Sequence, residues 1–168
     1  MSVSLFDVTI PVFIRGLKNL AAILEKGQAF ADEKGMDHQT LLGARLIAEM
    51  APLTAQIQRA SDTSKGFAVR VGGVPNVAME DNEASFSDLQ ARITATIRFL
   101  EGVPREAIEG KEDAPITLKL GGMDRSFTGL GYAMGFAMPN FFFHVTTAYA
   151  LLRQHGVPIG KMDYLGRS

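Results

Sequence analysis

The chain has 168 residues, of which 46% are hydrophobic and 21% are charged, a composition typical of one globular domain over residues 1–168. Its net charge of -1 comes from 17 basic and 18 acidic residues spread along the sequence, so we expect no nucleic-acid partner. The lack of cysteine excludes thiolate nucleophiles, disulfides and cysteine-ligated metal sites. The sequence shows no signal-peptide pattern and no apolar run of the roughly 20 residues that a membrane span needs, so we expect a cytoplasmic protein without a membrane partner.

The first amphipathic pattern begins at Phe6 and predicts a helix. Apolar residues recur there in steps of three and four, which places them on one face. Ser4 is placed to cap this helix, while Pro11 either bends its entry or moves its start to about residue 9. Gly35 follows a charged last turn and predicts the end of the helix.

A second pattern with the same rhythm runs from Leu42 to Val71, the longest regular pattern in the chain. Asp37 is placed to cap it. Pro52 lies inside the pattern, where it lacks an amide proton and crowds the preceding turn. We therefore expect one long helix with a kink at residues 48–52.

The remaining chain predicts a loop, two more helices and a hairpin. The loop extends to Ala84, and Ser85 begins a weak capping box before a helix that stops by Gly102. Alternating apolar residues and a Gly-Gly turn predict a two-stranded hairpin over 116–128. We start the last helix at about Asn140, because glycines weaken the stretch before it. The expected fold is an all-α, up-and-down four-helix bundle with the hairpin between helices three and four.

His144 is the histidine that this pattern places toward the interior of the bundle, where helical bundles hold metals. A catalytic metal usually needs about three protein ligands. Ala148 stands one turn after His144, and His155 lies about 16 Å along the helix axis, too far to share one ion. His38 has no neighbour at metal-ligand spacing. The open alternatives for His144 are a core or capping residue, a pocket residue, and the one candidate metal ligand, with a divalent metal disfavoured.

Other polar residues offer weaker candidates for a pocket. Asn140 is placed either to cap the last helix or to bind a substrate. Arg45 and Glu49 are at helical spacing, and so is Asp62 with its basic neighbours at 59 and 65. We interpret these groups as surface pairs that would join a pocket only if they turn inward. No serine or threonine stands in a pattern typical of a hydrolase.

The run of three phenylalanines at 141–143 is too wide for one helix face. At least one ring must therefore point away from the core of the bundle. We expect this ring either to cover the hairpin or to form a contact between two copies of the chain.

Three stretches resemble a known family: PNFFFHVTTAYALLRQHGVPIGKMDYLG, LLGARLIAEMAPLTAQIQRASDTSKG and EASFSDLQARITATIRFLEG. They are similar to an uncharacterised domain-of-unknown-function branch of the DinB/YfiT-like superfamily. The resemblance implies a four-helix bundle, often dimeric. Many members of this superfamily hold a divalent metal through three histidines, two of them four residues apart on the last helix and one on helix two, and some act as thiol-dependent transferases or isomerases. The resemblance matches His144 to one of these positions, Ala148 fills the next, and helix two has no histidine beyond His38.

These observations predict a homodimeric bundle protein that is a non-enzymatic or small-molecule-binding module, with a pocket near His144 and an incomplete three-histidine metal site; whether it is an enzyme stays open. One alternative is a metal- or thiol-cofactor-dependent transferase or isomerase that uses a pocket at His144. The other is a structural dimerisation module without a pocket.

Overall fold

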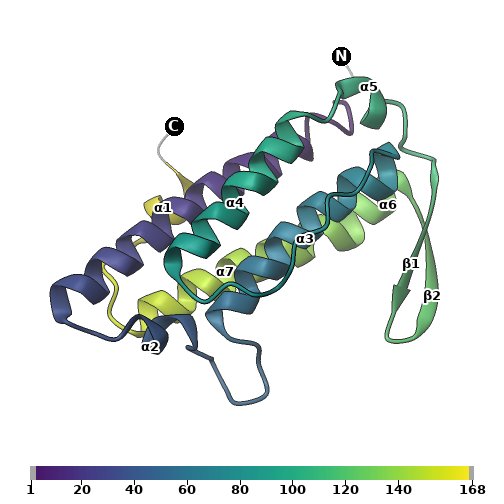
Figure 1. Cartoon of the computed structure of the whole chain (residues 1–168). Coiled ribbons are helices and arrows are strands. Elements are labelled where there is room, and N and C mark those ends of the chain that lie inside the picture. The colour runs from purple at the N-terminus through teal and green to yellow at the C-terminus, as the bar shows by residue number, and fades with distance from the viewer. Residues whose placement is uncertain (1–2, 167–168) are drawn as a thin grey trace.

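The structure is a computed structural model that describes residues 3–166. It is mostly helical with a small two-stranded antiparallel sheet, which confirms the predicted class. No helix within 3–166 is both long and apolar enough to cross a membrane. Four long helical segments of this region lie side by side (Figure 1): α1 (Ile10–Lys34), α3 (Leu53–Gly72), α4 (Phe86–Glu101), and a continuous rod made of α6 (Gly129–Tyr132), the π-helical turn η1 (Ala133–Ala137) and α7 (Met138–Gln154). Short helices α2 (His38–Leu42), α5 (Arg105–Ile108) and α8 (Lys161–Leu165) join or follow them.

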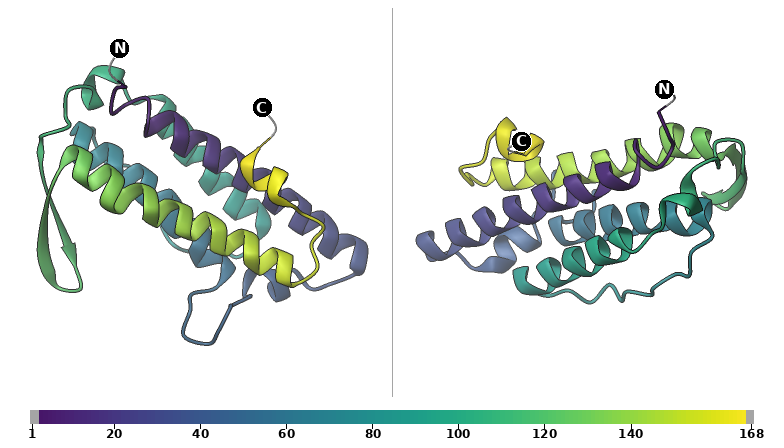
Figure 2. Two further views of the ribbon diagram at one scale, coloured as in Figure 1. Left: turned by 180° about the vertical axis from the view of Figure 1, so that it is seen from behind. Right: turned by 90° about the horizontal axis from the view of Figure 1, so that it is seen from above.

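The predicted up-and-down order of the helices is wrong. From N- to C-terminus, α1 and α7 run in the same direction along the molecule, and α3 and α4 run in the opposite direction (Figures 1 and 2). The reason is the connection 73–84, here called the return segment, which travels back along α3 before α4 begins. Lys65 Nζ donates to Val77 O at 2.7 Å and Gln58 Nε2 donates to Glu83 Oε2 at 2.8 Å, so later residues of the segment lie beside earlier residues of α3.

The first helix begins at the later of the two predicted starts and ends before Gly35, as predicted. Its first residue is Ile10, with Pro11 in the first turn, where a missing amide proton costs nothing. Gly35 ends the helix in the left-handed conformation with φ of 59°. Ser4 does not cap α1; its Oγ accepts from Asp7 N at 3.3 Å in the turn before it.

The prediction of one long second helix is wrong. This part of the chain forms two helices, α2 and α3, separated by a loop at residues 43–52. Pro52 does not kink a helix but directly precedes α3 as its N-cap residue, with extended backbone. Leu53 N donates to Ala44 O at 2.9 Å, which closes the loop at its base. Leu46, an apolar member of the predicted seam, is 50% exposed, so the core offers no packing that would favour a helix there.

The two predicted caps at Asp37 and Ser85 are confirmed. Asp37 Oδ1 accepts from Gln39 N at 2.9 Å at the start of α2. Ser85 Oγ accepts from Asp88 N at 3.1 Å, and Asp88 Oδ2 accepts from Ala84 N at 3.0 Å. This reciprocal pair satisfies two backbone donors at the start of α4.

The last helix begins at Gly129, well before the predicted start at Asn140, which lies inside the helix and caps nothing. Thr128 Oγ1 accepts from Gly131 N at 3.0 Å and caps the new start. A Cβ at Gly129 would collide with the carbonyl oxygen of Lys111, so only glycine lets the two backbones approach. Burial on this early part of the rod offsets the poor helix propensity of its glycines.

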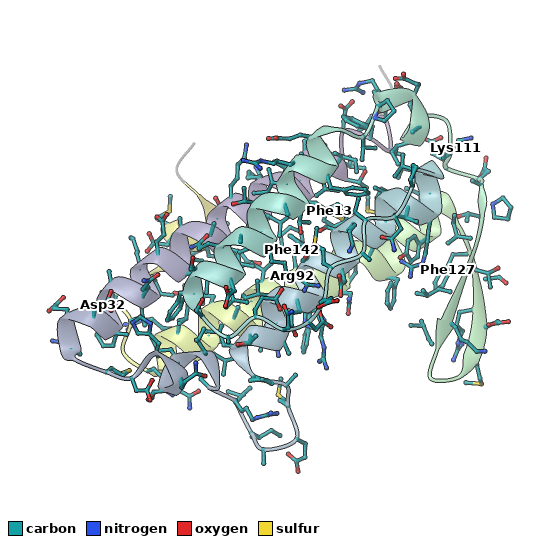
Figure 3. The ribbon with its side chains drawn as sticks, viewed as in Figure 1. Phe13, Asp32, Arg92, Lys111, Phe127 and Phe142 are labelled. Atoms are coloured by element: carbon teal, nitrogen blue, oxygen red, sulfur yellow. The ribbon has the colours of Figure 1, made fainter. Side chains whose placement is uncertain are left out.

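Aromatic side chains fill the centre of the bundle. The ring of Phe13 on α1, labelled in Figure 3, lies inside the bundle. Its centroid is 5.6 Å from that of Phe67 on α3 and 5.0 Å from that of Phe141 on α7. Gly16 faces the ring of Phe141 and leaves room for it. Phe143, in contrast, is 53% exposed, which confirms that one ring of the phenylalanine run points away from the core.

The sheet consists of β1 (Pro115–Leu120) and β2 (Met123–Thr128). The strands pair in register with Ile116 opposite Phe127, and Gly121 and Gly122 form the turn with φ of 57° and 82°. Ile116 is buried, and the ring of Phe127 lies 5.8 Å from that of Tyr132. The sheet is therefore fastened to the start of the rod.

A buried arginine fastens the return segment to the bundle. Arg92 on α4 is only 4% exposed and pairs with Glu83 at 2.7 Å, Asp81 at 2.8 Å and Asp62 at 2.9 Å (Figure 3). Burial by itself raises the pKa of Glu83, but hydrogen bonds from Arg92 and Gln58 outweigh it and hold this pKa below its ordinary value. The cluster keeps the return segment against α3 and α4.

Candidate functional site

The candidate site is a cleft between α3 and the rod, partly covered by strand β1. Its volume is about 270 Å³. Helix α3 contributes charged and polar side chains, the rod contributes aromatic and polar ones, and β1 contributes two leucines. The cleft is lined by Arg59, Asp62, Thr63, Arg70, Leu118, Leu120, Tyr132, Phe136, Asn140 and His144.

The π-helical turn aligns four residues of the rod along the cleft. Tyr132, Phe136, Asn140 and His144 follow one another in steps of four. In an ideal α-helix each such step drifts by about 40° around the axis. The wider π turn at Ala133–Ala137 offsets this drift, and such turns occur frequently at functional sites. The rings of Tyr132 and Phe136 stack with centroids 5.8 Å apart.

His144 is a neutral, hydrogen-bonded part of the cleft wall. It is 6% exposed, and its Nδ1 lies 2.8 Å from Gln56 Oε1. The amide nitrogen of Gln56 donates to Ala51 O at 2.8 Å, so Oε1 is the acceptor and His144 Nδ1–H donates to it. Burial, followed by the positive charge of Arg59, lowers the pKa of His144 to about 4.

This tautomer leaves His144 Nε2 with a lone pair. Among residues 3–166, Nε2 has no hydrogen-bond partner, and it is not one of the fully buried polar atoms. The neighbouring Asn140 Nδ2 donates to Thr63 Oγ1 at 2.7 Å, and Thr63 in turn donates to Arg59 O at 2.7 Å. The rod and α3 are thus joined by two side-chain hydrogen bonds at the cleft.

Two arginines of α3 face the same cleft. Arg70 Nη1 donates to Tyr132 Oη at 3.1 Å, and its guanidinium lies over Gly66, where any Cβ would collide with it. Burial raises the pKa of Tyr132, so the phenol stays protonated at neutral pH. Arg59 is exposed and forms no ion pair within residues 3–166.

Asp62 lines the cleft, and its carboxylate is paired with two basic side chains that do not line it. Its Oδ1 lies 2.9 Å from Arg92 Nη2 and 3.6 Å from Lys65 Nζ. The predicted spacing of Asp62 and Lys65 therefore yields an ion pair, whereas Arg59 does not join it in the described part of the chain. Asp62 forms no hydrogen bond with His144.

Arg45 and Glu49 do not line the cleft. Both are exposed in the loop at 43–52, where Arg45 Nη1 donates to Met50 O at 2.6 Å. They form no ion pair with each other in the described residues, because their segment is not helical and the four-residue spacing does not bring them together.

The side chains around His144 do not fit the three-histidine metal site that the family resemblance implied. Within residues 3–166 no group of three or more His, Cys, Asp or Glu side chains is placed to hold a metal ion. The residue that faces His144 from α3 is Gln56, and Ala148 follows on α7. His155 bonds a carbonyl of its own helix, and His38 pairs with a carboxylate of α1.

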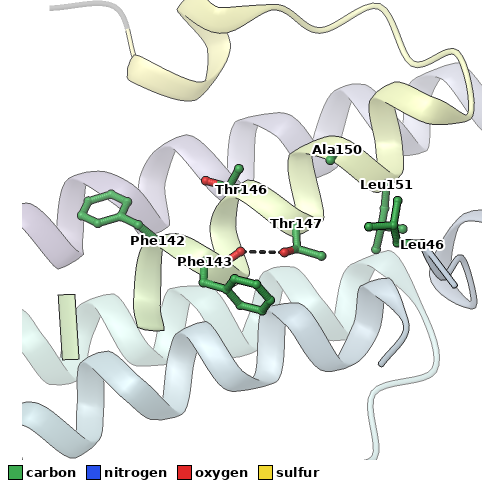
Figure 4. A pocket seen from close by; sticks show the side chains of 7 residues that line it. All are labelled: Leu46, Phe142, Phe143, Thr146, Thr147, Ala150 and Leu151. Carbon is green, nitrogen blue, oxygen red and sulfur yellow. Dashed lines mark hydrogen bonds between the residues drawn. The ribbon is translucent and has the colours of Figure 1, made fainter. Parts of the chain in front are cut away.

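A larger apolar groove of about 400 Å³ lies on the outer face of α7. It is lined by Leu46, Phe142, Phe143, Thr146, Thr147, Ala150 and Leu151 (Figure 4). None of these side chains is ionisable, and Thr147 Oγ1 already donates to Phe143 O at 2.7 Å. The groove offers a contact surface, whereas the cleft offers hydrogen-bonding chemistry.

Comparisons with known proteins agree with this structure. The model of the DUF1993 family, described as a domain of unknown function, matches residues 5–165. The chain belongs to the DUF1993 family. A solved structure described as a DinB family member from Shewanella denitrificans matches it with a TM-score of 0.87 and 37% identity, over 98% of this chain and 93% of that one. The comparison with curated proteins found no match. The DUF1993 chain is thus DinB-like, as its sequence resemblance indicated.

Sequence reasoning missed several cleft residues of this DUF1993 protein. Tyr132 and Phe136 lie in the glycine-rich stretch that we did not assign to a helix. The repeated step of four that leads from them to His144 was the available signal. Gln56 carried no signal, because a glutamine beside an apolar seam is usual on a helix surface, and only the packing of α3 against α7 shows its partner.

Proposed function

We propose that this DUF1993 protein binds a small molecule in the cleft and is not an enzyme. The observation that supports this function is that polar side-chain atoms without a partner in residues 3–166 lie in the same cleft. His144 Nε2 is an acceptor without a partner in residues 3–166, and Arg59 faces it from α3. His144 is only 6% exposed, so its Nε2 is poorly hydrated, and a ligand with a matching donor supplies the missing hydrogen bond.

A fragment titration followed by amide and side-chain NMR tests this function. The panel contains neutral and charged compounds of a size that fits the cleft. We expect the resonances of Tyr132, Asn140 and His144 to shift on binding. Asn140→Trp, whose indole fills part of the cleft, should abolish the shifts of Tyr132 and His144, whereas Ala150→Leu, a change in the groove outside the cleft, should leave them intact. Binding that maps only to the groove, or no binding at all, would contradict the proposal.

A separate measurement tests the alternative function, the metal-dependent transferase that the resemblance implied. Protein purified without chelator or affinity tag is analysed for bound metals. Stoichiometric zinc or nickel that disappears in His144→Ala would overturn the non-enzymatic proposal. Equal, substoichiometric metal in the wild type and in His144→Ala is the expected result.

We also propose that the protein forms a homodimer through the groove. Leu46 is 50% exposed, Ile47 57% and Phe143 53%, and the groove between Leu46 and Phe143 has no charged lining residue. A second copy presents the same uncharged apolar surface, which a two-fold interface requires. Sedimentation velocity should show a dimer that Phe143→Asp dissociates and that Met123→Asp, on the exposed hairpin tip, does not. A monomer at all concentrations would contradict it.

A further inference from the structure

We propose that the ligand of the cleft is a small organic anion, a carboxylate carried on an apolar body. This inference rests on the proposed binding function and names its ligand class. It follows from the uncompensated charge of the cleft, from the fixed position of one arginine, and from the apolar character and size of the remaining walls.

The cleft carries positive charge that the protein does not neutralise. Arg59 and Arg70 both line it, and neither pairs with a carboxylate within residues 3–166. The one acidic side chain at the rim, Asp62, is already shared by Arg92 and Lys65. His144 is neutral and adds no charge. Guanidinium groups bind carboxylates through paired, charge-assisted hydrogen bonds, which makes an anion the complementary ligand.

The guanidinium of Arg70, an exposed residue, is positioned before any ligand binds by one hydrogen bond and by the open space at Gly66. One of its nitrogens donates to the hydroxyl of Tyr132, whose ring is buried and stacked on Phe67 at 6.1 Å. The lack of a side chain at Gly66 provides the space in which the guanidinium lies. A guanidinium has five N–H donors, so this single bond leaves most of them for a ligand. Positioning in advance reduces the entropy that binding costs.

The other walls suit an apolar body of limited size. The stacked rings of Tyr132 and Phe136 form one side, and Leu118 and Leu120 of β1 form another. The cleft volume of about 270 Å³ has room for a one-ring or short-chain acid. A bare inorganic anion would leave these walls unfilled.

The test compares acids with amides of the same shape. Benzoate and phenylacetate are titrated into the full chain at pH 7, alongside benzamide and phenylacetamide, with NMR as the readout. We expect each acid to bind about tenfold more tightly than its amide, as a charged hydrogen bond predicts. Arg59→Gln and Arg70→Gln should each weaken benzoate binding, while Arg98→Gln, an exposed position on α4 outside the cleft, should not.

The outcomes separate this inference from the proposed function. If acids and amides bind in the cleft with equal affinity, the cleft binds small molecules but is not selective for anions, and only the present inference is overturned. It is also overturned if acid binding survives both arginine substitutions, or if inorganic phosphate binds as tightly as benzoate. If no compound of either set binds, the inference and the proposed function fail together.

Discussion

His144 Nδ1 lies 2.8 Å from Gln56 Oε1, and this hydrogen bond joins α7 to α3 at the wall of the cleft. Because the glutamine oxygen only accepts, it holds the imidazole in the tautomer with a proton on Nδ1. A histidine that the sequence left open as a core, pocket or metal-binding residue is therefore part of a neutral hydrogen-bonded wall. Its buried environment also makes the stability of the fold depend on pH.

Acidification should destabilise the protein through His144. Its pKa is about 4 in the folded chain and 6.5 when unperturbed, so the unfolded chain binds this proton first as the pH falls. No penalty exists above pH 6.5, and the full penalty, on the order of 3 kcal/mol, is present below pH 4. Arg59, Asp62 and Arg70 are the charged groups that line the same cleft.

Urea unfolding at pH 7 and pH 4.5 measures this effect. We expect His144→Gln to lose less stability between the two pH values than the wild type, because the carboxylates common to both proteins cancel in the comparison. The control His38→Gln changes a half-exposed histidine beside Asp32. It should lose as much stability between the two pH values as the wild type does, because His144 is still present. Parallel curves for wild type and His144→Gln would show that His144 is not a buried neutral group.

Arg92→Met should destabilise the fold by about 3 kcal/mol, because it leaves the nearly buried carboxylate of Glu83 without its cation. The return segment should then exchange its amide protons faster, a change that hydrogen–deuterium exchange over residues 73–84 detects. Arg98→Met, on the exposed face of the same helix, should change the stability by no more than about 0.5 kcal/mol. Equal losses of stability in the two variants would show that Arg92 does not hold the return segment against the bundle.

Gly129→Ala should cost several kcal/mol, about as much as a buried overpacking change, because the new methyl group collides with the carbonyl oxygen of Lys111. Gly135 is the matched control within the same rod, since a Cβ there meets open space. Gly135→Ala should leave the stability unchanged or raise it by up to about 1 kcal/mol. Thermal unfolding measures both, and a tolerated Gly129→Ala would mean that the backbone at Lys111 does not approach the rod as closely as described.

Gly66→Ala should separate stability from binding. Alanine improves the helix propensity of α3 by up to about 1 kcal/mol, while its methyl group displaces the guanidinium of Arg70. Unfolding experiments should therefore show an unchanged or higher stability, and the benzoate titration should show weaker binding. Unaltered benzoate affinity in a well-folded Gly66→Ala variant would mean that the position of Arg70 does not matter to the ligand.

The sequence by itself determined the features that depend on neighbouring residues. The apolar rhythm of α1 and α4, the caps at Asp37 and Ser85, and the stop at Gly35 all follow from contacts within a few positions. It also pointed to His144 as a side chain on a buried face, which the structure bears out with 6% exposure.

Only the tertiary structure decided the rest, because those features depend on contacts between distant segments. The seam around Leu46 is helical in pattern but has no core to pack against, so it forms a loop. The glycine-rich stretch from Gly129 is poor in helix propensity but is buried against the hairpin connection, so it forms a helix. The partner of His144 is eighty-eight positions away in the chain, and no local pattern could name Gln56. Packing between helices, rather than periodicity within them, therefore determines the chemistry of the cleft.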